Sequence, residues 1–465
     1  MWLNKFANKI QPQKEIFSME TIITEIVGKL KREIEEFSKE KGHSIDEAER
    51  YFVPRIKEAV TAFLSSYYEE MDRELREDKA GRKAEGLRVV RCQDQREVLT
   101  QLGTVRYRRT YYRKASGDYE YPVDKVAGLA AYQRISDSVG TALVENAAVM
   151  TYANASALVT DGYVSRQTVM NKIRQSRAVK PPVLVRNVPV LHIDADEDHV
   201  ALQTGKSTIV PLISSYEGTV KHGKRGECVN VFHVSEYGKS AETLWEQFSD
   251  ELDRRYDLTN TRIYLHGDGA SWIKKGLEYL PNSTFVLDRY HVNSAKKQAL
   301  AGYDGQTKTQ YLQALHEAEV SGDRDLYESL VESICAQGGS GNADAARYLL
   351  NNFEAIHIHH ADPEASRGGA TEPHVSHVLS SRLSSRPMGW SKTTLKHLVP
   401  ILAAGAATLR PPIDHDEPFI SQFKHYLKPK KKSFLPNSLG LPDPDSAVFP
   451  RTRTGHRPYA LNLLT

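Results

Sequence analysis

A change of hydrophobic period in the middle of the chain constrains the fold more than any other feature. Between residues 183 and 287, short runs rich in valine, isoleucine and leucine replace the helical spacing that precedes and follows them. We expect strands at residues 183–193, 207–215, 229–234, 262–266 and 284–287, and helices at 241–256 and 271–280. Three successive strands followed by alternating helix and strand predict an α/β layer covered by helices.

The flanking patterns divide the rest of the chain into further regions. We expect an N-terminal helical region at 1–90, a small β-hairpin module at 91–135, a helix-turn-helix region at 136–180, the α/β domain at 181–400 with a helical insertion at about 293–360, and a tail at 401–465. The tail is basic and proline-rich, with Lys428, Lys430, Lys431 and Lys432. Either phosphate contact or simple solvation explains such a tail.

The composition argues against a membrane-embedded or disulfide-stabilised protein. The 465 residues are 40% hydrophobic and 26% charged, and no apolar run approaches the roughly 20 residues of a membrane span. The N-terminus lacks the apolar stretch of a secretory signal, so we expect a cytoplasmic protein. Cys92, Cys228 and Cys335 are too few for a disulfide framework and too widely spaced for a zinc knuckle. A net charge of +3 does not by itself indicate nucleic acid.

Residues 154–171 have the pattern of a helix-turn-helix. A helix ending near Thr160, a turn at Asp161-Gly162-Tyr163 and a helix cap at Ser165 follow one another. The second helix begins with polar residues that can meet base edges in a major groove. The predicted DNA-binding residues are Ser165, Arg166, Gln167, Thr168 and Asn171. Packing of an ordinary helix pair into the core is the alternative.

A second basic segment interleaves cations with aromatic residues. Between residues 106 and 114, four arginines and one lysine alternate with Tyr107, Tyr111 and Tyr112. Such a face can contact phosphates, and it is equally typical of an exposed hairpin edge.

Three acids stand at the ends of predicted elements. Asp194 closes the first strand of the α/β domain, Asp268 follows the strand at 262–266, and Glu372 opens a helix. Strand ends are where sites collect in open α/β sheets, and several acids that converge there require a cation. Two Mg²⁺ or Mn²⁺ ions bridged by carboxylates would suit phosphodiester chemistry. With 59 acidic residues in the chain, any one of them could instead be structural.

Asp288 and His291 form a second constellation. Asp288 ends another predicted strand, and His291 stands three residues later, near the start of a helix. The pair could assist the acids as auxiliary residues, or Asp288 could simply cap the helix.

Four motifs, taken in order, resemble the ISLre-type insertion-sequence transposases. They are Ile193-Asp194-Ala195-Asp196-Glu197-Asp198-His199-Val200, His266-Gly267-Asp268-Gly269-Ala270-Ser271-Trp272-Ile273, Asp288-Arg289-Tyr290-His291, and His374-Val375-Ser376-His377 with Arg386-Pro387-Met388-Gly389-Trp390. The resemblance covers nearly the whole chain. It implies an RNase H-like mixed sheet flanked by helices, with a helical insertion before the last residue of an Asp-Asp-Glu triad.

The resemblance also implies which acids form the triad. Asp194 would be the first acid, Asp268 the second and Glu372 the third, while Asp196 and Asp198 compete for the first place. The chain is also similar to Mutator-type transposases, whose acid-x-x-His motif Asp288 and His291 match. Pro373 stands where the family has glycine, which alters the entry to the helix that carries the third acid.

The expected function is therefore that of a DNA transposase. Such a protein would act on the terminal inverted repeats of its element and on target DNA, associate with the nucleoid, work as a homo-oligomer and require no membrane. Two alternatives remain open. One is a DNA-binding relic that has lost catalysis, and the other is a zinc hydrolase that uses His357, His359, His360 and Asp362.

Overall fold

The computed structural model describes residues 12–39, 44–180, 182–223, 225–337 and 340–408. The lysines of the predicted tail at 428–432 lie outside these described residues. The start of that tail was placed too early, because residues 401–404 belong to the helix α18 (Lys392–Ala404).

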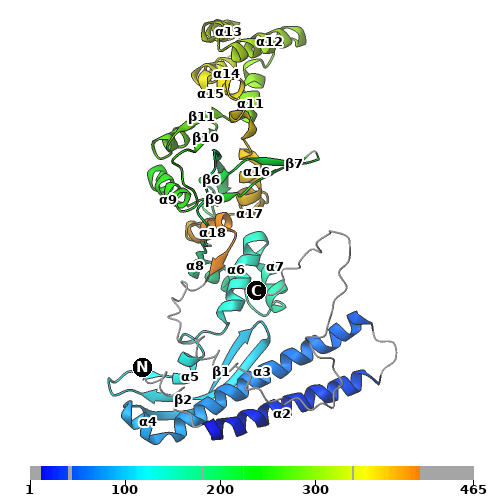
Figure 1. Cartoon of the computed structure of the whole chain (residues 1–465), viewed down its shortest axis with the longest axis vertical. Helices are drawn as coiled ribbons and strands as arrows, with labels where there is room; N and C mark the ends of the chain where they lie inside the picture. The colour runs from blue at the N-terminus through cyan, green and yellow to red at the C-terminus, as the bar shows by residue number, and fades with distance from the viewer. Residues whose placement is uncertain (1–11, 40–43, 181, 224, 338–339, 409–465) are drawn as a thin grey trace. The chain divides into compact units, whose positions relative to one another are not determined.

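Two long helices and a short one form the N-terminal region, as predicted. Figure 1 shows α2 (Pro12–Phe37) beside α3 (Ile45–Glu77), which α4 (Lys79–Ala84) follows. Ser44 caps α3, since its side chain accepts a hydrogen bond from the Glu47 backbone while Glu47 bonds back to the Ser44 amide.

A three-stranded antiparallel sheet packs against α3. Its strands are β1 (Arg88–Thr100), β2 (Gly103–Arg113) and β3 (Tyr119–Glu120), and α5 (Pro122–Val126) follows. Side chains of α3 bind backbone amides of β2, and the pairs are Ser65 with Arg106 at 3.2 Å, Glu69 with Arg108 at 2.9 Å, and Asp72 with Thr110 at 2.7 Å. Because these acceptors stand at 65, 69 and 72, one face of α3 covers the edge of β2.

The helix-turn-helix pattern forms the predicted elements. After α6 (Asp137–Val149), α7 (Tyr152–Thr160) ends at Asp161, whose φ of 50° is left-handed. Gly162 follows with a φ of 77°, and the Ser165 side chain caps α8 (Arg166–Gln175) by accepting from the Thr168 amide. The three helices share an apolar core with α18 and with the far end of the central sheet.

A five-stranded mixed sheet forms the centre of the α/β domain. Its strands are β5 (Val190–Ala201), β6 (Ser207–Tyr216), β9 (Phe232–Val234), β10 (Arg262–Gly267) and β11 (Ser283–Leu287). They lie in the order β11-β10-β5-β6-β9. β5, β6 and β9 pair antiparallel, whereas β10 is parallel to both β5 and β11. An α/β fold with a mixed sheet is therefore confirmed.

The first strand of this sheet differs from its predicted bounds. β5 begins at Val190 and continues to Ala201, so Asp194 lies inside the strand and does not close it. A small hairpin of β7 (Thr219–His222) and β8 (Arg225–Cys228) was not predicted. The short β4 (Arg177–Ala178) and β12 (Ala407–Thr408) also pair with each other.

Helices cover both faces of the sheet. Odd-numbered residues of β5, from Leu191 to Ala195, pack on α9 (Ala241–Asp253), α10 (Ser271–Lys274) and the 3₁₀ turn η1 (Lys275–Glu278). The opposite face carries the even-numbered residues and contacts α16 (Thr371–Val375). Figure 1 shows α9 and α16 on opposite sides of the strands. The alternation of β5 side chains thus separates an apolar face from an acidic one.

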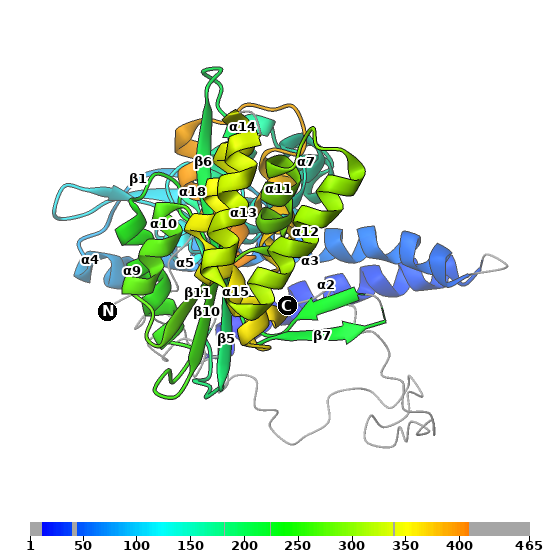
Figure 2. The ribbon, with the colours of Figure 1, turned by 90° about the horizontal axis from the view of Figure 1, so that it is seen from above.

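The predicted helical insertion has its own core. It consists of α11 (Arg289–Ala299), α12 (Gly305–Ser321), α13 (Arg324–Gln337), α14 (Ser340–Asn351) and α15 (Phe353–Ala361). Figure 2 shows these helices gathered together. Their apolar residues form a cluster that begins at Leu287, the last residue of β11.

The chain returns to the sheet after the insertion. The 3₁₀ turn η2 (Ala365–Arg367) precedes α16, the π-helical turn η3 (Ser376–Ser380) and α17 (Ser381–Leu383). Trp390 then bonds through its backbone to Ala201 and Gln203 and through its indole to Leu383, which fastens this segment to the end of β5. None of the helices in the described residues is both long and apolar enough to cross a membrane.

Candidate functional site

Acidic side chains line one face of β5 and meet an acid from the next strand. Asp194, Asp196 and Asp198 alternate along β5 and share its face. β10 runs parallel to β5, with His266 opposite Asp194. Two residues further along the chain, Asp196 on β5 and Asp268, directly after the end of β10, therefore come to the same level of the sheet.

Asp194 is occupied by contacts within the protein. Its side chain is buried, its Oδ1 accepts a hydrogen bond from the Tyr216 hydroxyl at 3.1 Å, and its Oδ2 accepts one from the Ala370 amide at 2.9 Å. The same Oδ2 lies 3.2 Å from Nδ1 of His374. Burial would lower the pKa of His374, but the Asp194 carboxylate and the Cys228 side chain together raise it to about 9. Three groups of the protein thus hold Asp194 in place, and its predicted role as the first acid stays a prediction.

The contacts of Asp194 fasten the 368–371 segment across the sheet. Gly368 lies directly on two buried histidines, where a Cβ would overlap the His266 ring and stand 2.5 Å from Nδ1 of His192. The next three residues each bind a different group, namely the Gly369 amide to the Tyr216 hydroxyl at 2.9 Å, the Ala370 amide to Asp194, and the Thr371 hydroxyl to Asp288 at 2.9 Å. Only a glycine fits at 368. The contacts of residues 368–371 hold their backbone in place, and they thereby determine where residue 372 lies.

Glu372 is that following residue. It is exposed in the first turn of α16, next to the buried Thr371. Pro373 is accommodated because it also lies in the first turn, where an amide has no helical partner, and the first bond of the helix runs from the His374 amide to the Ala370 carbonyl. The unusual proline therefore leaves the entry of the helix intact.

Asp268 is held by the glycines on either side of it. A Cβ on Gly267 would stand 2.9 Å from the Ala195 carbonyl oxygen, and Gly269 has a φ of 87°. The Asp268 side chain accepts a bond from the Ala270 amide at 2.8 Å, and its carbonyl accepts one from the Tyr348 hydroxyl at 2.5 Å. One carboxylate oxygen of Asp268 is thereby fixed while the loop stays close to β5.

The electrostatics of Asp196 reveal which acids share its surroundings. Burial, together with the charges of Glu372 and Asp268, raises the pKa of Asp196 to about 6, against the lowering effect of the Glu197 backbone and of His291. Asp196, Asp268 and Glu372 are thus brought together, although they stand far apart in sequence. We call these three residues the acid site.

His291 and Asp288 lie beside the acid site. Asp288 is buried and caps α11 by accepting from the Tyr290 amide, as the capping alternative predicted. His291 lies 3.7 Å from Oδ1 of Asp288, and this carboxylate, together with Asp196 and Asp268, raises its pKa despite burial. Burial acts to raise the pKa of Asp288. Hydrogen bonds with His291 and Thr371 outweigh this effect, so the pKa is lowered. Asp288 therefore positions neighbouring segments, while His291 faces the acids.

Asp198 has a separate structural partner. It is buried, and its Oδ1 accepts a hydrogen bond from the Ser384 hydroxyl at 2.8 Å. This contact ties β5 to the segment after α17, so Asp198 is not part of the acid site.

The acid site offers the type of ligand atom that hard cations prefer. Three carboxylates offer the oxygen ligands that Mg²⁺ and Mn²⁺ prefer. In the described part of the chain, their oxygens do not all lie within 4.8 Å of one another.

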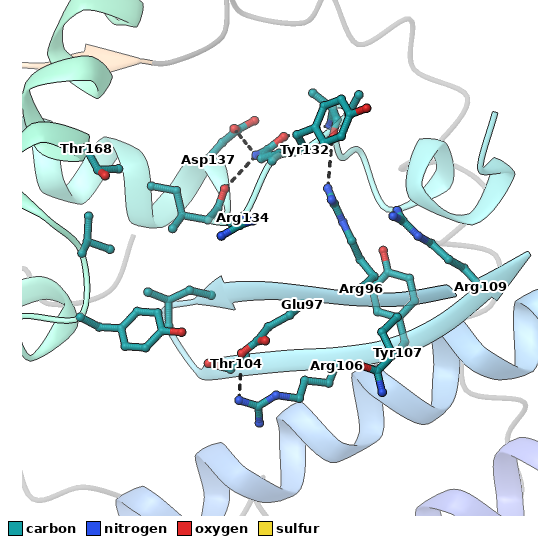
Figure 3. A pocket seen from close by; sticks show the side chains of 18 of the residues that line it. Arg96, Glu97, Thr104, Arg106, Tyr107, Arg109, Tyr132, Arg134, Asp137 and Thr168 are labelled. Atoms are coloured by element: carbon teal, nitrogen blue, oxygen red, sulfur yellow. Dashed lines mark hydrogen bonds and ion pairs between the residues drawn. The ribbon is translucent and has the colours of Figure 1, made fainter. Parts of the chain in front are cut away.

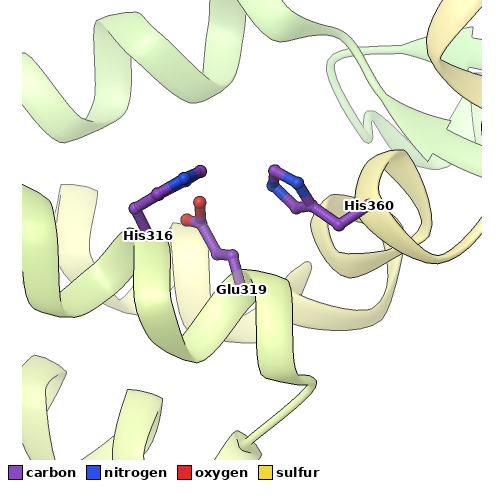
Figure 4. A group of neighbouring side chains, drawn as sticks. All are labelled: His316, Glu319 and His360. Atoms are coloured by element: carbon purple, nitrogen blue, oxygen red, sulfur yellow. The ribbon is translucent and has the colours of Figure 1, made fainter.

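A second group of ligand-type side chains lies between α12 and α15. Figure 4 shows His316, Glu319 and His360 turned toward one another, and their ligand atoms all lie within 4.8 Å. Glu319 is buried, and it already binds Lys296 Nζ at 2.6 Å and the Tyr327 hydroxyl at 3.1 Å. The charge of its carboxylate is therefore balanced within the protein.

The four residues of the zinc-hydrolase hypothesis are not gathered in one site. His357 Nδ1 contacts the Glu319 carbonyl oxygen at 2.7 Å, and His359 Nε2 contacts the Leu287 carbonyl oxygen at 2.7 Å. Asp362 instead binds the side chains of Tyr264 and Arg262, and His360 belongs to the group just described. This separation leaves the hypothesis without the ligand set it assumed.

Most of the predicted DNA-binding residues are exposed at the start of α8. Ser165, Arg166, Gln167 and Asn171 are exposed and Thr168 is half-buried, whereas Val169 and Ile173 face the core. Gln167 donates to Asn171 at 3.2 Å, which aligns two amide side chains on one face. The helix thus presents a polar face of the kind that reads base edges.

Several residues that shape the site were not singled out from the sequence. Tyr216, His192 and His266 form the surface under the 368–371 segment, and His374 pairs with Asp194. The two histidines stand two residues before Asp194 and Asp268, respectively. A histidine two residues before each of these acids was the one feature of the sequence that could have indicated that the histidines lie together.

Comparison with known proteins identifies a family. Residues 38–409 match the model described as an uncharacterised protein family, UPF0236. The UPF0236 protein TTE2489 of Caldanaerobacter subterraneus subsp. tengcongensis is 35% identical over 369 residues, which cover 77% of each chain. Another UPF0236 protein of that organism, whose name joins eleven TTE designations, is 36% identical over 354 residues, 74% of this chain and 75% of its own.

A more distant relative comes from Streptococcus gallolyticus. It is named as a UPF0236 protein in the vanSb 3' region and is 27% identical over 402 residues, 83% of this chain and 86% of its own. Since the family match spans most of the chain and includes the acid site, the helix-turn-helix and the helical insertion, the chain belongs to the UPF0236 family.

Proposed function

We propose that this chain is a DNA transposase that cuts and joins DNA with two divalent metal ions held at the acid site. The single observation that carries the proposal is the meeting of Asp196, Asp268 and Glu372 from three distant segments, with their charges acting on one another. Like charges in a half-buried site are costly unless a cation compensates them.

The sheet topology supports the proposal. Three antiparallel strands come first, and two parallel strands are added beside β5 in the order β11-β10-β5-β6-β9. This arrangement agrees with the RNase H-like domain that the resemblance implies. The helical insertion α11–α15 also precedes the last acid, as expected of that family.

The proposal assigns Asp196, and not Asp194, as the first acid. Asp194 binds three protein groups and positions the 368–371 segment, whereas Asp196 faces the other two acids. Asp194 and Asp288 are then positioning residues, because each holds part of the segment that leads to Glu372.

The side chains of the site divide the work as follows. Asp196, Asp268 and Glu372 would hold the ions, which when bound activate the attacking oxygen and stabilise the departing one. The neighbouring acids raise the pKa of His291, and its protonated form can pair with a phosphate oxygen. The exposed face of α8 would bind the DNA of the element ends.

The names of the relatives add circumstantial support. One Caldanaerobacter relative carries eleven designations in its name, and another carries four. Several designations for one protein are what a sequence present in many copies would acquire, and a mobile element multiplies its own gene in that way.

The test is cleavage of duplex DNA that carries the flanks of the reading frame, in the presence of Mg²⁺. We expect Asp268→Asn and Asp196→Asn to reduce cleavage by at least about a hundredfold, the scale on which a group that stabilises the transition state acts. DNA binding by both variants should be retained. Asp250→Asn, which changes an exposed carboxylate of α9, is the matched control and should cleave normally.

Two results would contradict this proposal. Full cleavage by Asp196→Asn together with loss in Asp194→Asn would return the first place to Asp194. DNA binding without cleavage by the unaltered chain, in either Mg²⁺ or Mn²⁺, would favour the catalytically inactive relic.

A further inference from the structure

We propose that the cleft between the β1–β2 hairpin and the start of α8 binds the phosphate backbone of the DNA duplex that α8 contacts. This inference rests on the proposed function and deepens it, because it gives the N-terminal hairpin module a part in DNA binding. The occupant is one strand of duplex DNA beside the groove that takes α8.

Three segments build the walls of the cleft, and Glu69 of α3 adds to them. The hairpin contributes residues from 95 to 109, the connection to α6 contributes 130–137, and the helix-turn-helix contributes 163–175. The cavity is large, about 1550 Å³, and Figure 3 shows side chains that line it, among them Arg106 on the hairpin, Arg134 on the connection to α6 and Thr168 on α8. The hairpin and α8 therefore face a common space.

The lining of the cleft carries more positive than negative charge. Six cations line it, Arg96, Arg106, Arg108, Arg109, Arg134 and Lys172, against three acids, Glu69, Glu97 and Asp137. Arg106 is paired with Glu97 at 2.9 Å. For Arg108 and Arg134, both exposed, the described residues provide no carboxylate within 4 Å. These two guanidinium groups can therefore bind phosphate.

The wall of the hairpin holds a further excess of positive charge. Arg96 and Arg109 are both buried, and both pair with the same carboxylate, Asp124. That carboxylate also accepts a hydrogen bond from the Tyr107 hydroxyl at 2.7 Å. Two buried guanidinium groups that share one acid leave a positive potential at the wall, which an approaching anion would reduce.

Two exposed tyrosines stand at the cleft. Tyr132 is 93% exposed and has a φ of 59°, and Tyr163, in the turn between α7 and α8, is 73% exposed. A non-glycine residue in the left-handed region with a bare aromatic ring is unusual in a folded protein. Tyrosine hydroxyls donate to phosphate and sugar oxygens, so both rings suit contact with a nucleic-acid backbone.

The cleft and the reading helix share residues. Ser165 and Thr168, predicted to meet DNA, also line the cleft, as does Lys172 one turn later. A duplex whose major groove takes α8 places its own backbone beside that helix. The hairpin cations would then contact the strand adjacent to the groove.

The decisive experiment measures DNA binding against salt concentration. The probe is a fluorescent duplex that carries the flank of the reading frame, and the variant is the double change Arg108→Glu and Arg134→Glu. Both residues are exposed, so the fold should persist. We expect at least about a tenfold loss of affinity and a decrease of about two in the slope of log affinity against log salt.

The matched control is Arg88→Glu. Arg88 is exposed on the partner strand, β1, but does not line the cleft, so its replacement should leave the affinity and the salt slope unchanged. Equal affinity and slope in the double variant and the unaltered chain would overturn the inference while leaving the proposed function intact. Absence of any duplex binding by the unaltered chain would instead overturn the proposed function.

Discussion

Two groups of potential metal ligands, the acid site on the central sheet and the His316–Glu319–His360 group between α12 and α15, differ in what surrounds their carboxylates. Glu319 is buried against Lys296 and Tyr327, which supply a positive charge and a hydroxyl donor. The carboxylate of Asp196 instead meets the charges of two further acids, which the Glu197 backbone and His291 oppose. Close approach of ligand atoms is therefore a weaker indication of a cation site than unbalanced charge.

The largest effect on stability should come from removing the cation that balances Glu319 in the His316–Glu319–His360 group, which we call the balanced group. Lys296→Met leaves the buried Glu319 carboxylate without its cation, and we expect it to lower the free energy of unfolding by about 3–5 kcal/mol. Chemical denaturation measures this loss. Lys297→Met, the exposed neighbour on α11, is the control and should change stability by less than about 0.5 kcal/mol. Equal stability of both variants would show that Lys296 does not balance Glu319.

Neutralising Asp196 in the acid site should raise the free energy of unfolding instead of lowering it. The pKa of Asp196 is raised to about 6 by burial and by its acidic neighbours, so the folded chain favours the protonated form. This contribution is present below the unfolded pKa near 4 and is lost as pH rises through about 6. Without divalent metal, Asp196→Asn should therefore raise the free energy of unfolding at pH 7 by about 1–2 kcal/mol and leave it unchanged at pH 4.

Added Mn²⁺ should reverse that difference. The ion stabilises the unaltered chain by binding the folded state, whereas the Asp196→Asn variant has lost a ligand. Thermal unfolding of both proteins, with and without Mn²⁺ and at pH 4 and pH 7, measures their stability under these four conditions. A variant less stable than the unaltered chain in the absence of metal would mean that Asp196 is balanced by the protein.

The smallest effect concerns the histidines of the balanced group. Replacing His316 and His360 by alanine should change the calorimetric affinity for Mn²⁺ by less than about tenfold, or 1.4 kcal/mol, because the acid site supplies the ligands. Both histidines are exposed, so the fold should tolerate the change. A full equivalent of Zn²⁺ that binds the unaltered chain and is lost in this variant would instead make the second group a metal site in its own right.

Much of the fold could be predicted because local signals agreed with the tertiary contacts. Asp161-Gly162 and Ser165 mark the turn and the cap of the helix-turn-helix, since a left-handed residue and a capping hydroxyl have clear preferences. The predicted end of β5 at residue 193 was wrong for a physical reason. Three aspartates on one face suggest that the strand has ended, yet contacts from residues such as Ala370 and Ser384 cover that face.

The choice between Asp194 and Asp196 shows what the sequence could not decide. Both side chains lie on the same face of β5, and both follow the same apolar run. What separates them is a backbone amide 176 residues away, at Ala370, together with Tyr216 and His374. Long-range contacts of this kind leave no local pattern, so the sequence alone could not tell the surroundings of the two positions apart.

The covering of the β2 edge by α3 also bears on how this protein can be divided for study. Ser65, Glu69 and Asp72 occupy the amides through which another strand would bind. A fragment that begins at β1 would expose those amides, and open strand edges promote aggregation. Truncations intended to isolate the N-terminal half should therefore keep α3, and copies of the chain that associate would have to join through surfaces other than this edge.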